Sequence, residues 1–212
     1  MEGAEPIGHR IDLLDVFALL GLRMTTLTHS RRNVLADGTQ QDIATGGLAV
    51  LGKRAVDRCQ ELGIVLDVAH LSDRGFWDVI ERATQPVVCS HTSVLHPSPG
   101  YRAPWDEQNA TYGMSKAEAI AKSGGLIGIV FWSMADTAEL VNEADAIVAQ
   151  TGIDHVALGT DFFGFRDAPR DVQHIGELPA LTDALIQRGY DDEAILKLLG
   201  ENWMRVFDAC WR

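Results

Sequence analysis

Short apolar runs alternate along this chain with longer segments whose apolar residues recur at helical spacing. Runs of this kind, two of them rich in β-branched residues, are typical of buried parallel strands. We predict strands at residues 23–28, 64–68, 86–89, 126–131 and 155–160. The amphipathic segments predict helices at residues 11–22, 48–62, 73–83, 115–122, 137–151, 175–188, 191–199 and 201–211. This alternation is typical of an α/β protein whose strands are joined by parallel crossovers.

The number of strands limits the architecture. An eight-stranded α/β barrel usually needs about 250 residues, whereas this chain has 212 residues and its pattern predicts five strands. We therefore expect a single domain over residues 1–212, built as the later part of a (β/α)8 TIM barrel with about five βα units. A complete five-stranded doubly wound sheet is the structural alternative.

Four of the five predicted strands end in a residue that can bind a metal ion or move a proton. These residues are His29, His70, His91 and Asp161. The carboxyl ends of parallel strands form the edge where α/β proteins place ligands, and adjacent strands lie about 5 Å apart. His70 and His91 follow consecutive strands and can therefore share one metal ion, although a histidine in such a position is often an ordinary loop residue. The remaining histidines are interpreted as surface or helix-end residues: His9, His96, His155 and His174.

Composition excludes several classes of partner. The formal net charge of −12 argues against nucleic acids and anionic membrane surfaces. No apolar run approaches the ~20 residues that a membrane span needs, and the first residues lack the features of a signal peptide. The three cysteines, Cys59, Cys89 and Cys210, form no CxxC pair. A reducing, cytoplasmic location is the simplest expectation.

Five motifs together resemble the membrane or renal dipeptidase family of zinc peptidases. They are LTHS at residues 27–30, LDVAHLS at 66–72, SHTS at 90–93, GTDFFG at 159–164 and GENWMRVF at 200–207. The resemblance runs from Glu2 to the end of the chain, in the order of the family. It implies a barrel of the metal-dependent hydrolase type, two zinc ions and hydrolysis of dipeptides, including those with a D-residue on the carboxyl side.

The resemblance also implies a set of metal ligands. Glu2, in the pair Glu2-Gly3, matches the family's bridging glutamate, and His70 and His91 match the two histidines that complete the second metal's protein ligands. The other ligands of the first metal come from a His-x-Asp motif on the family's first strand, and no such motif precedes Glu2. We expect this chain, as the later two thirds of the barrel, to bind at most one zinc tightly.

Three further residues match positions that act on the substrate in that family. His29 matches the histidine that contacts the substrate carbonyl and the tetrahedral intermediate. Arg102 lies eleven residues after His91, in a long Pro- and Gly-containing loop, and matches the arginine that holds the substrate's terminal carboxylate. Asp161 matches the proposed proton shuttle.

The leading hypothesis is therefore a zinc dipeptidase that acts on small peptides. An inactive, truncated relative that binds one metal or a small ligand is one alternative, and a non-peptide amidohydrolase on the same scaffold is another. A barrel that lacks strands exposes sheet edges and inner apolar faces. We therefore also expect a homo-oligomer.

Overall fold

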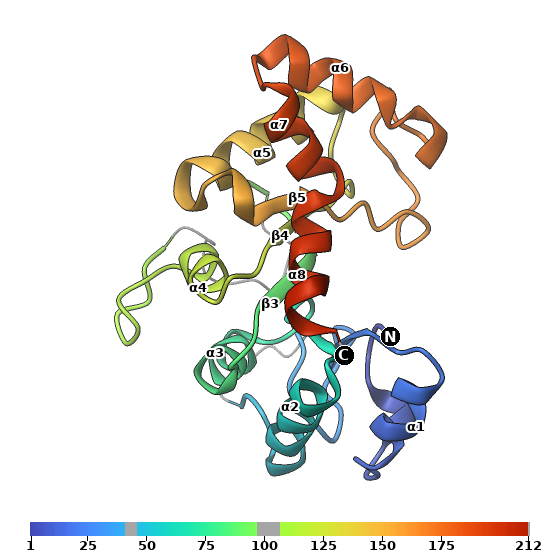
Figure 1. The fold of residues 1–212 in the computed structure, drawn as a ribbon, viewed down its shortest axis with the longest axis vertical. Coiled ribbons are helices and arrows are strands. Elements are labelled where there is room, and N and C mark those ends of the chain that lie inside the picture. Colours follow the sequence, from blue (N-terminus) through green and yellow to red (C-terminus); the bar gives the residue numbers. More distant parts are fainter. Residues whose placement is uncertain (41–45, 97–106, 212) are drawn as a thin grey trace.

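The computed structural model describes residues 1–40, 46–96 and 107–211. Its five strands form one parallel sheet in the order β1-β2-β3-β4-β5 (Figure 1). The strands are β1 (Met24–Thr26), β2 (Val65–Asp67), β3 (Val87–Thr92), β4 (Ile127–Ile129) and β5 (Val156–Leu158). Each strand pairs with its neighbour in the sequence. A doubly wound sheet reverses its strand order at a switch point, so this sheet is instead an arc of a TIM barrel, as predicted.

Eight α-helices accompany the sheet in the described residues. They are α1 (Leu13–Leu19), α2 (Val50–Leu62), α3 (Asp73–Arg82), α4 (Lys116–Lys122), α5 (Thr137–Thr151), α6 (Pro179–Arg188), α7 (Asp192–Leu196) and α8 (Asn202–Cys210). Several boundaries follow from local chemistry. Ser72 and Ser115 cap α3 and α4 with their hydroxyls, and Gly63 ends α2 at a φ of 70°. Polar N-caps satisfy amide groups that have no partner inside the helix.

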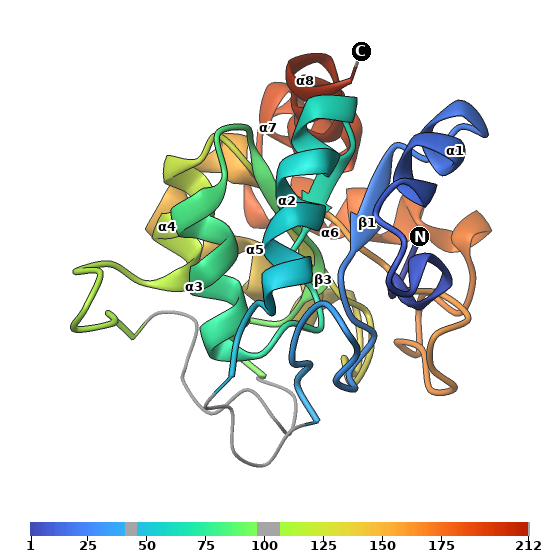
Figure 2. The same ribbon diagram turned by 90° about the horizontal axis from the view of Figure 1, so that it is seen from below.

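The main core lies between the strands and the crossover helices. Alternate strand residues such as Leu66, Val87 and Ile127 pack there with apolar side chains of α2, α3, α4 and α5. Figure 2 shows α2, α3 and α4 together on one side of the strands β1 and β3. Neighbouring strand residues point to opposite faces, so Val65 and Val88 pack on the other side, against α8.

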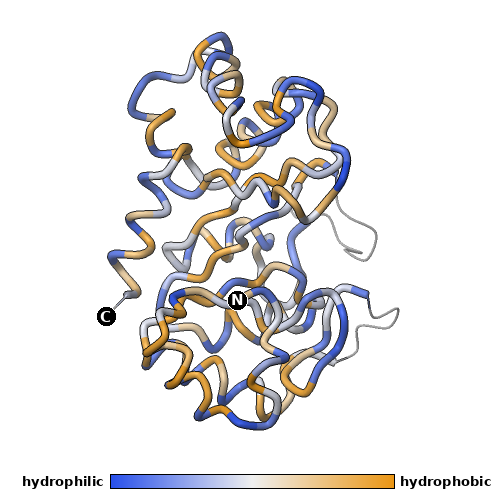
Figure 3. The backbone as a smooth tube through the Cα atoms, turned by 90° about the vertical axis from the view of Figure 1, so that its right-hand side faces the viewer, coloured by the Kyte–Doolittle hydropathy of each residue, from blue (hydrophilic) through white to orange (hydrophobic). Residues whose placement is uncertain are grey.

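Helix α8 crosses the inner face of the sheet near the amino-terminal ends of its strands. Figure 1 shows it passing over β3, β4 and β5, and Figure 3 shows hydrophobic and hydrophilic residues alternating along it. Its Arg205 donates to Gly124 O and Asp154 O, and Trp203 donates to Leu158 O at 2.9 Å. These carbonyls lie near the ends of strands, so α8 ties several crossovers together.

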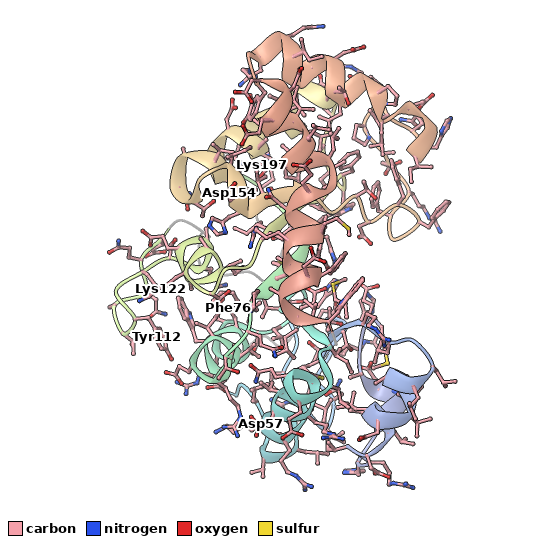
Figure 4. The ribbon with its side chains drawn as sticks, viewed as in Figure 1. Asp57, Phe76, Tyr112, Lys122, Asp154 and Lys197 are labelled. Atoms are coloured by element: carbon pink, nitrogen blue, oxygen red, sulfur yellow. The ribbon has the colours of Figure 1, made fainter. Side chains whose placement is uncertain are left out.

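One predicted helix is divided into two elements in the structure. The predicted helix at 175–188 is a 3-10 turn, Ile175–Glu177, followed by α6, which begins at Pro179. Proline suits this first position because it has no N–H to leave unpaired. The break predicted at Gly200 is present: its backbone is not helical, with φ 179° and ψ −25°, and it kinks the turn Lys197–Glu201 between α7 and α8. Lys197 anchors this turn to Asp154 at 3.0 Å (Figure 4).

The first residues run along the free edge of β1 and are not frayed. Met1 N donates to Met24 O at 2.8 Å, and Thr26 N donates to Met1 O at 3.0 Å, which is the pattern of a parallel strand pair. Glu2 therefore lies at the carboxyl edge of the sheet. Gly3 follows at a φ of 80°, where an added Cβ would come 2.3 Å from the Glu5 carboxylate.

We predict that this chain self-associates in solution. An apolar groove of about 680 Å³ lies between the edge of β1 and the α7–α8 segment, and Leu19 on α1 is 88% exposed. An exposed apolar groove is a candidate contact surface. Light scattering across a concentration series should give a mass above 23.2 kDa. A monomer that melts cooperatively at every concentration would contradict this prediction.

Candidate functional site

Three side chains converge at the carboxyl edge of the sheet, from three segments distant in sequence. The Nε2 atoms of His70 and His91 lie 2.8 Å apart. Glu2 Oε1 lies 3.0 Å from His70 Nε2 and 3.5 Å from His91 Nε2. The structure thus brings together the three residues that the resemblance implies as ligands. Among the described residues they form the one such cluster of His, Cys, Asp or Glu donors.

The three donors fit a zinc ion. Zinc binds imidazole nitrogen and carboxylate oxygen at about 2.0–2.2 Å in tetrahedral geometry, which sets ligand atoms about 3.3 Å apart. The remaining ring nitrogens contact hydroxyls: His70 Nδ1 lies 3.2 Å from Ser30 Oγ, and His91 Nδ1 lies 2.8 Å from Ser90 Oγ. Such contacts fix ring orientation in metal sites. Both Nε2 atoms therefore remain directed at the cluster.

The electrostatics of His70 also suit a metal ligand. Burial lowers the pKa of its imidazole, and the nearby His91 and His29 rings lower that pKa further, against the opposing charge of Glu2. A lowered pKa keeps the ring neutral at physiological pH, with a lone pair available for a metal.

Backbone strain accompanies these side chains. His70, Ser30 and Asp161 adopt left-handed conformations, with φ of 64°, 63° and 56°. Few residues other than glycine do so, and such strain clusters at functional sites. At His70 this conformation turns the chain sharply out of β2. His91 differs from its prediction, because it lies within β3 and not beyond the strand's end.

A cavity of about 400 Å³ opens over the three donors, a volume in the range of small-molecule sites. His29 and Asp161 both line it, and the His29 ring packs edge-on against His70 with centroids 4.7 Å apart. Burial raises the pKa of the Asp161 carboxyl, although the charge of His91 opposes this. An imidazole, a carboxyl group with a raised pKa and three side chains that could hold a metal ion thus share one cavity.

An apolar wall of this cavity was not predicted from the sequence. Val130, Trp132 and Phe165 supply it, and Trp132 is 39% exposed. Phe165 is held by stacking on Phe162 at 6.2 Å. One feature of the sequence could have indicated this wall. β4 ends in an aromatic residue, whereas each of the other four predicted strands ends in a histidine or an aspartate.

A buried carboxylate behind the site was also missed. Glu143 of α5 is 0% exposed and accepts hydrogen bonds from Ser93 Oγ at 2.5 Å, Val94 N at 2.8 Å and Leu95 N at 3.1 Å. His96, expected to be a surface residue, is half exposed, and its Nδ1 lies 3.3 Å from Glu143 Oε1. Glu143 therefore holds the chain directly after β3. The sequence could have indicated this buried carboxylate, because Glu143 lies on the apolar face of α5.

Arg102, the residue expected to hold the substrate's terminal carboxylate, lies outside the described residues. The three cysteines are buried free thiols. None of the described helices has the length and apolarity to cross a membrane.

Comparison with known proteins places this site in context. The family model described as membrane dipeptidase, peptidase family M19, matches residues 1–210. An uncharacterized protein from the pqqA 5' region of Klebsiella pneumoniae is 32% identical over 177 residues, covering 78% of this chain and 62% of that protein. The dipeptidase tcpJ of Claviceps purpurea is 27% identical, covering 97% of this chain and 48% of that protein.

Solved structures agree with the family match. A metallo peptidase from Rhodobacter sphaeroides, liganded with a phosphinate mimic of the dipeptide L-Ala-D-Ala, superposes with a TM-score of 0.87 and 29% identity, covering all of this chain and 62% of that one. This chain thus spans 48% to 62% of the length of these three relatives.

Proposed function

Because the chain belongs to the membrane dipeptidase family, peptidase family M19, we propose that it carries the metal-binding edge of a zinc-dependent dipeptidase. The observation that carries this proposal is the convergence of Glu2, His70 and His91 within 4.8 Å. The cavity above them also holds His29 and Asp161. Residues 1–212 would form the later two thirds of the barrel.

The chemistry divides between a bound metal and several side chains of this chain. Glu2, His70 and His91 would hold one zinc through a carboxylate oxygen and two imidazole nitrogens. Zinc, when bound, lowers the pKa of its water to about 7 and polarises a carbonyl. His29, beside His70, would donate a hydrogen bond to the oxyanion formed at the peptide carbonyl.

Asp161 would move the proton. The carboxylate accepts a proton from the attacking water and passes it to the amine of the leaving residue. Burial raises the pKa of this carboxyl, and a raised pKa makes the carboxylate a stronger base for the proton of the attacking water. The relative with bound ligand holds a mimic of L-Ala-D-Ala. That ligand supports our proposal that dipeptides with a D-residue on the carboxyl side are substrates.

A variant of Arg102 can test whether the substrate is a free dipeptide. We propose that its guanidinium binds the terminal carboxylate of the substrate, since the protein is acidic overall and an anionic substrate needs a local cation. A charge-assisted hydrogen bond is worth about 1.5–3 kcal/mol. In the complete product of the gene, Arg102→Ala should therefore lower kcat/KM for a free dipeptide by roughly ten- to a hundredfold.

The same variant should have little effect on a dipeptide amide, which lacks the carboxylate. Arg54→Ala removes the same charge from the exposed face of α2 and serves as the control. Equal losses on both substrates would favour a non-peptide amidohydrolase. Absence of any hydrolysis by the zinc-loaded parent would favour an inactive relative. A cytoplasmic location and a homo-oligomer both stay predictions.

A further inference from the structure

One buried carboxylate joins the two segments that carry the histidine cluster. Asp67, the last residue of β2, is 4% exposed. Its Oδ1 accepts two backbone hydrogen bonds, from Ala69 N at 3.0 Å and from Ser90 N at 2.9 Å. Ala69 and Ser90 directly precede His70 and His91. A single oxygen atom therefore contacts the backbone next to both histidines.

This oxygen replaces a backbone carbonyl that would accept a hydrogen bond in a regular parallel sheet. β2 and β3 pair with Asp67 opposite Val88, and their last backbone bond runs from Val68 N to Val88 O at 2.8 Å. In a continuing parallel ladder, Ser90 N would next donate to Val68 O. Val68 O instead accepts from Leu71 N at 3.3 Å, because the chain turns out of the strand. Ser90 N therefore donates its hydrogen bond to the Asp67 carboxylate.

The two strands thus lose their backbone pairing at the point where the histidines project. Beyond Val68 and Val88, the spacing between the two segments depends on a side chain. The donor atoms of a zinc site must sit within a few tenths of an ångström of their ideal separation. A group that fixes this spacing therefore controls the metal site without touching the metal.

We propose that Asp67 is a positioning residue that sets the separation of His70 and His91 through this shared oxygen. The inference rests on the proposed function for the metal, but not for the hydrogen bonds. It requires an acceptor at the Oδ1 position, and it does not require a negative charge. Asparagine keeps an oxygen at the same distance from the backbone, whereas alanine removes it and glutamate displaces it by one methylene.

The test is a cobalt titration of the chain, followed by the visible absorption that reports histidine and carboxylate coordination. Asp67→Ala and Asp67→Glu should weaken cobalt binding by about ten- to a hundredfold, the range found for residues that orient metal ligands. Asp67→Asn should stay within about threefold of the parent. Asp67→Glu keeps the test valid if the alanine variant fails to fold.

Asp78→Ala is the matched control. Asp78 is also a nearly buried carboxylate, and it accepts from Leu48 N at 2.8 Å and pairs with Arg74, on the outer helix α3. Its loss should lower the melting temperature and leave cobalt affinity unchanged. A folded Asp67→Ala that binds cobalt like the parent would overturn the proposal. So would an Asp67→Asn that loses as much affinity as the alanine variant.

Amide hydrogen exchange separates this inference from the proposed function. A parent chain that binds no cobalt would contradict the metal site itself. The positioning role is then decided by the amides of Ala69 and Ser90. They should be protected in the parent and in Asp67→Asn and should lose protection together in Asp67→Ala. Unchanged protection in the alanine variant would overturn it.

Discussion

His70→Ala should remove tight zinc binding from this protein. The imidazole contacts both other donors, with its Nε2 3.0 Å from Glu2 Oε1 and 2.8 Å from His91 Nε2. Zinc sites of four ligands bind with about 10–16 kcal/mol, so one ligand contributes about 3 kcal/mol. The affinity should therefore fall by about a hundredfold or more. Mass spectrometry of the dialysed chain should find about one zinc in the parent and almost none in the variant.

His174→Ala is the control for this experiment. His174 is exposed and pairs with Glu177 at 3.6 Å, away from the cavity, so its loss should leave the zinc content unchanged. The described residues supply donors for one ion. Two zinc equivalents retained by the parent and lost together in His70→Ala would contradict the single-ion prediction.

Asp161→Asn should lower kcat by about a hundred- to ten-thousandfold, the usual contribution of a general acid–base group. The amide has nearly the same shape, so KM and zinc content should change little. The parent's kcat should also fall as the pH drops and the carboxylate takes up its proton. The variant should lack this acid limb. The measurement is a pH–rate profile on a dipeptide, with the complete product of the gene.

Asp167→Asn provides the matched control, because Asp167 is exposed in the same segment after β5. It should keep both the rate and the acid limb. A variant at Asp161 that retained full kcat, or the same acid limb as the parent, would show that another group moves the proton.

The strand ends explain why much of this site was predictable from sequence. Parallel strands that follow one another in the sheet place their carboxyl ends along one edge, so His70, His91 and Asp161 had to approach one another once the strands were recognised. Glu2 was harder, because no apolar run precedes it. Its placement followed only from the resemblance to a family, and the structure explains it by the bonds of Met1 to β1.

The residues that were not predicted act through contacts between distant segments. Glu143 and Ser93 are 50 positions apart, and a buried carboxylate on an apolar helix face gives no hint of its partner. Trp132 follows a strand as an ordinary aromatic residue would. It lines the cavity together with Phe165, which comes from the segment after β5. Periodicity assigns such residues to elements, but tertiary packing decides what they touch.

The path of α8 has a consequence for synthesis on the ribosome. Trp211 donates to Arg23 O across 188 positions, and Cys210 and Val206 pack with Val65 and Val88. The five strands leave the ribosome long before these partners do. Until residues beyond Asn202 emerge, the inner face of the sheet near its amino-terminal edge stays open to water. Contacts this distant in sequence form slowly, so the nascent chain should present this apolar face to chaperones until the helix docks.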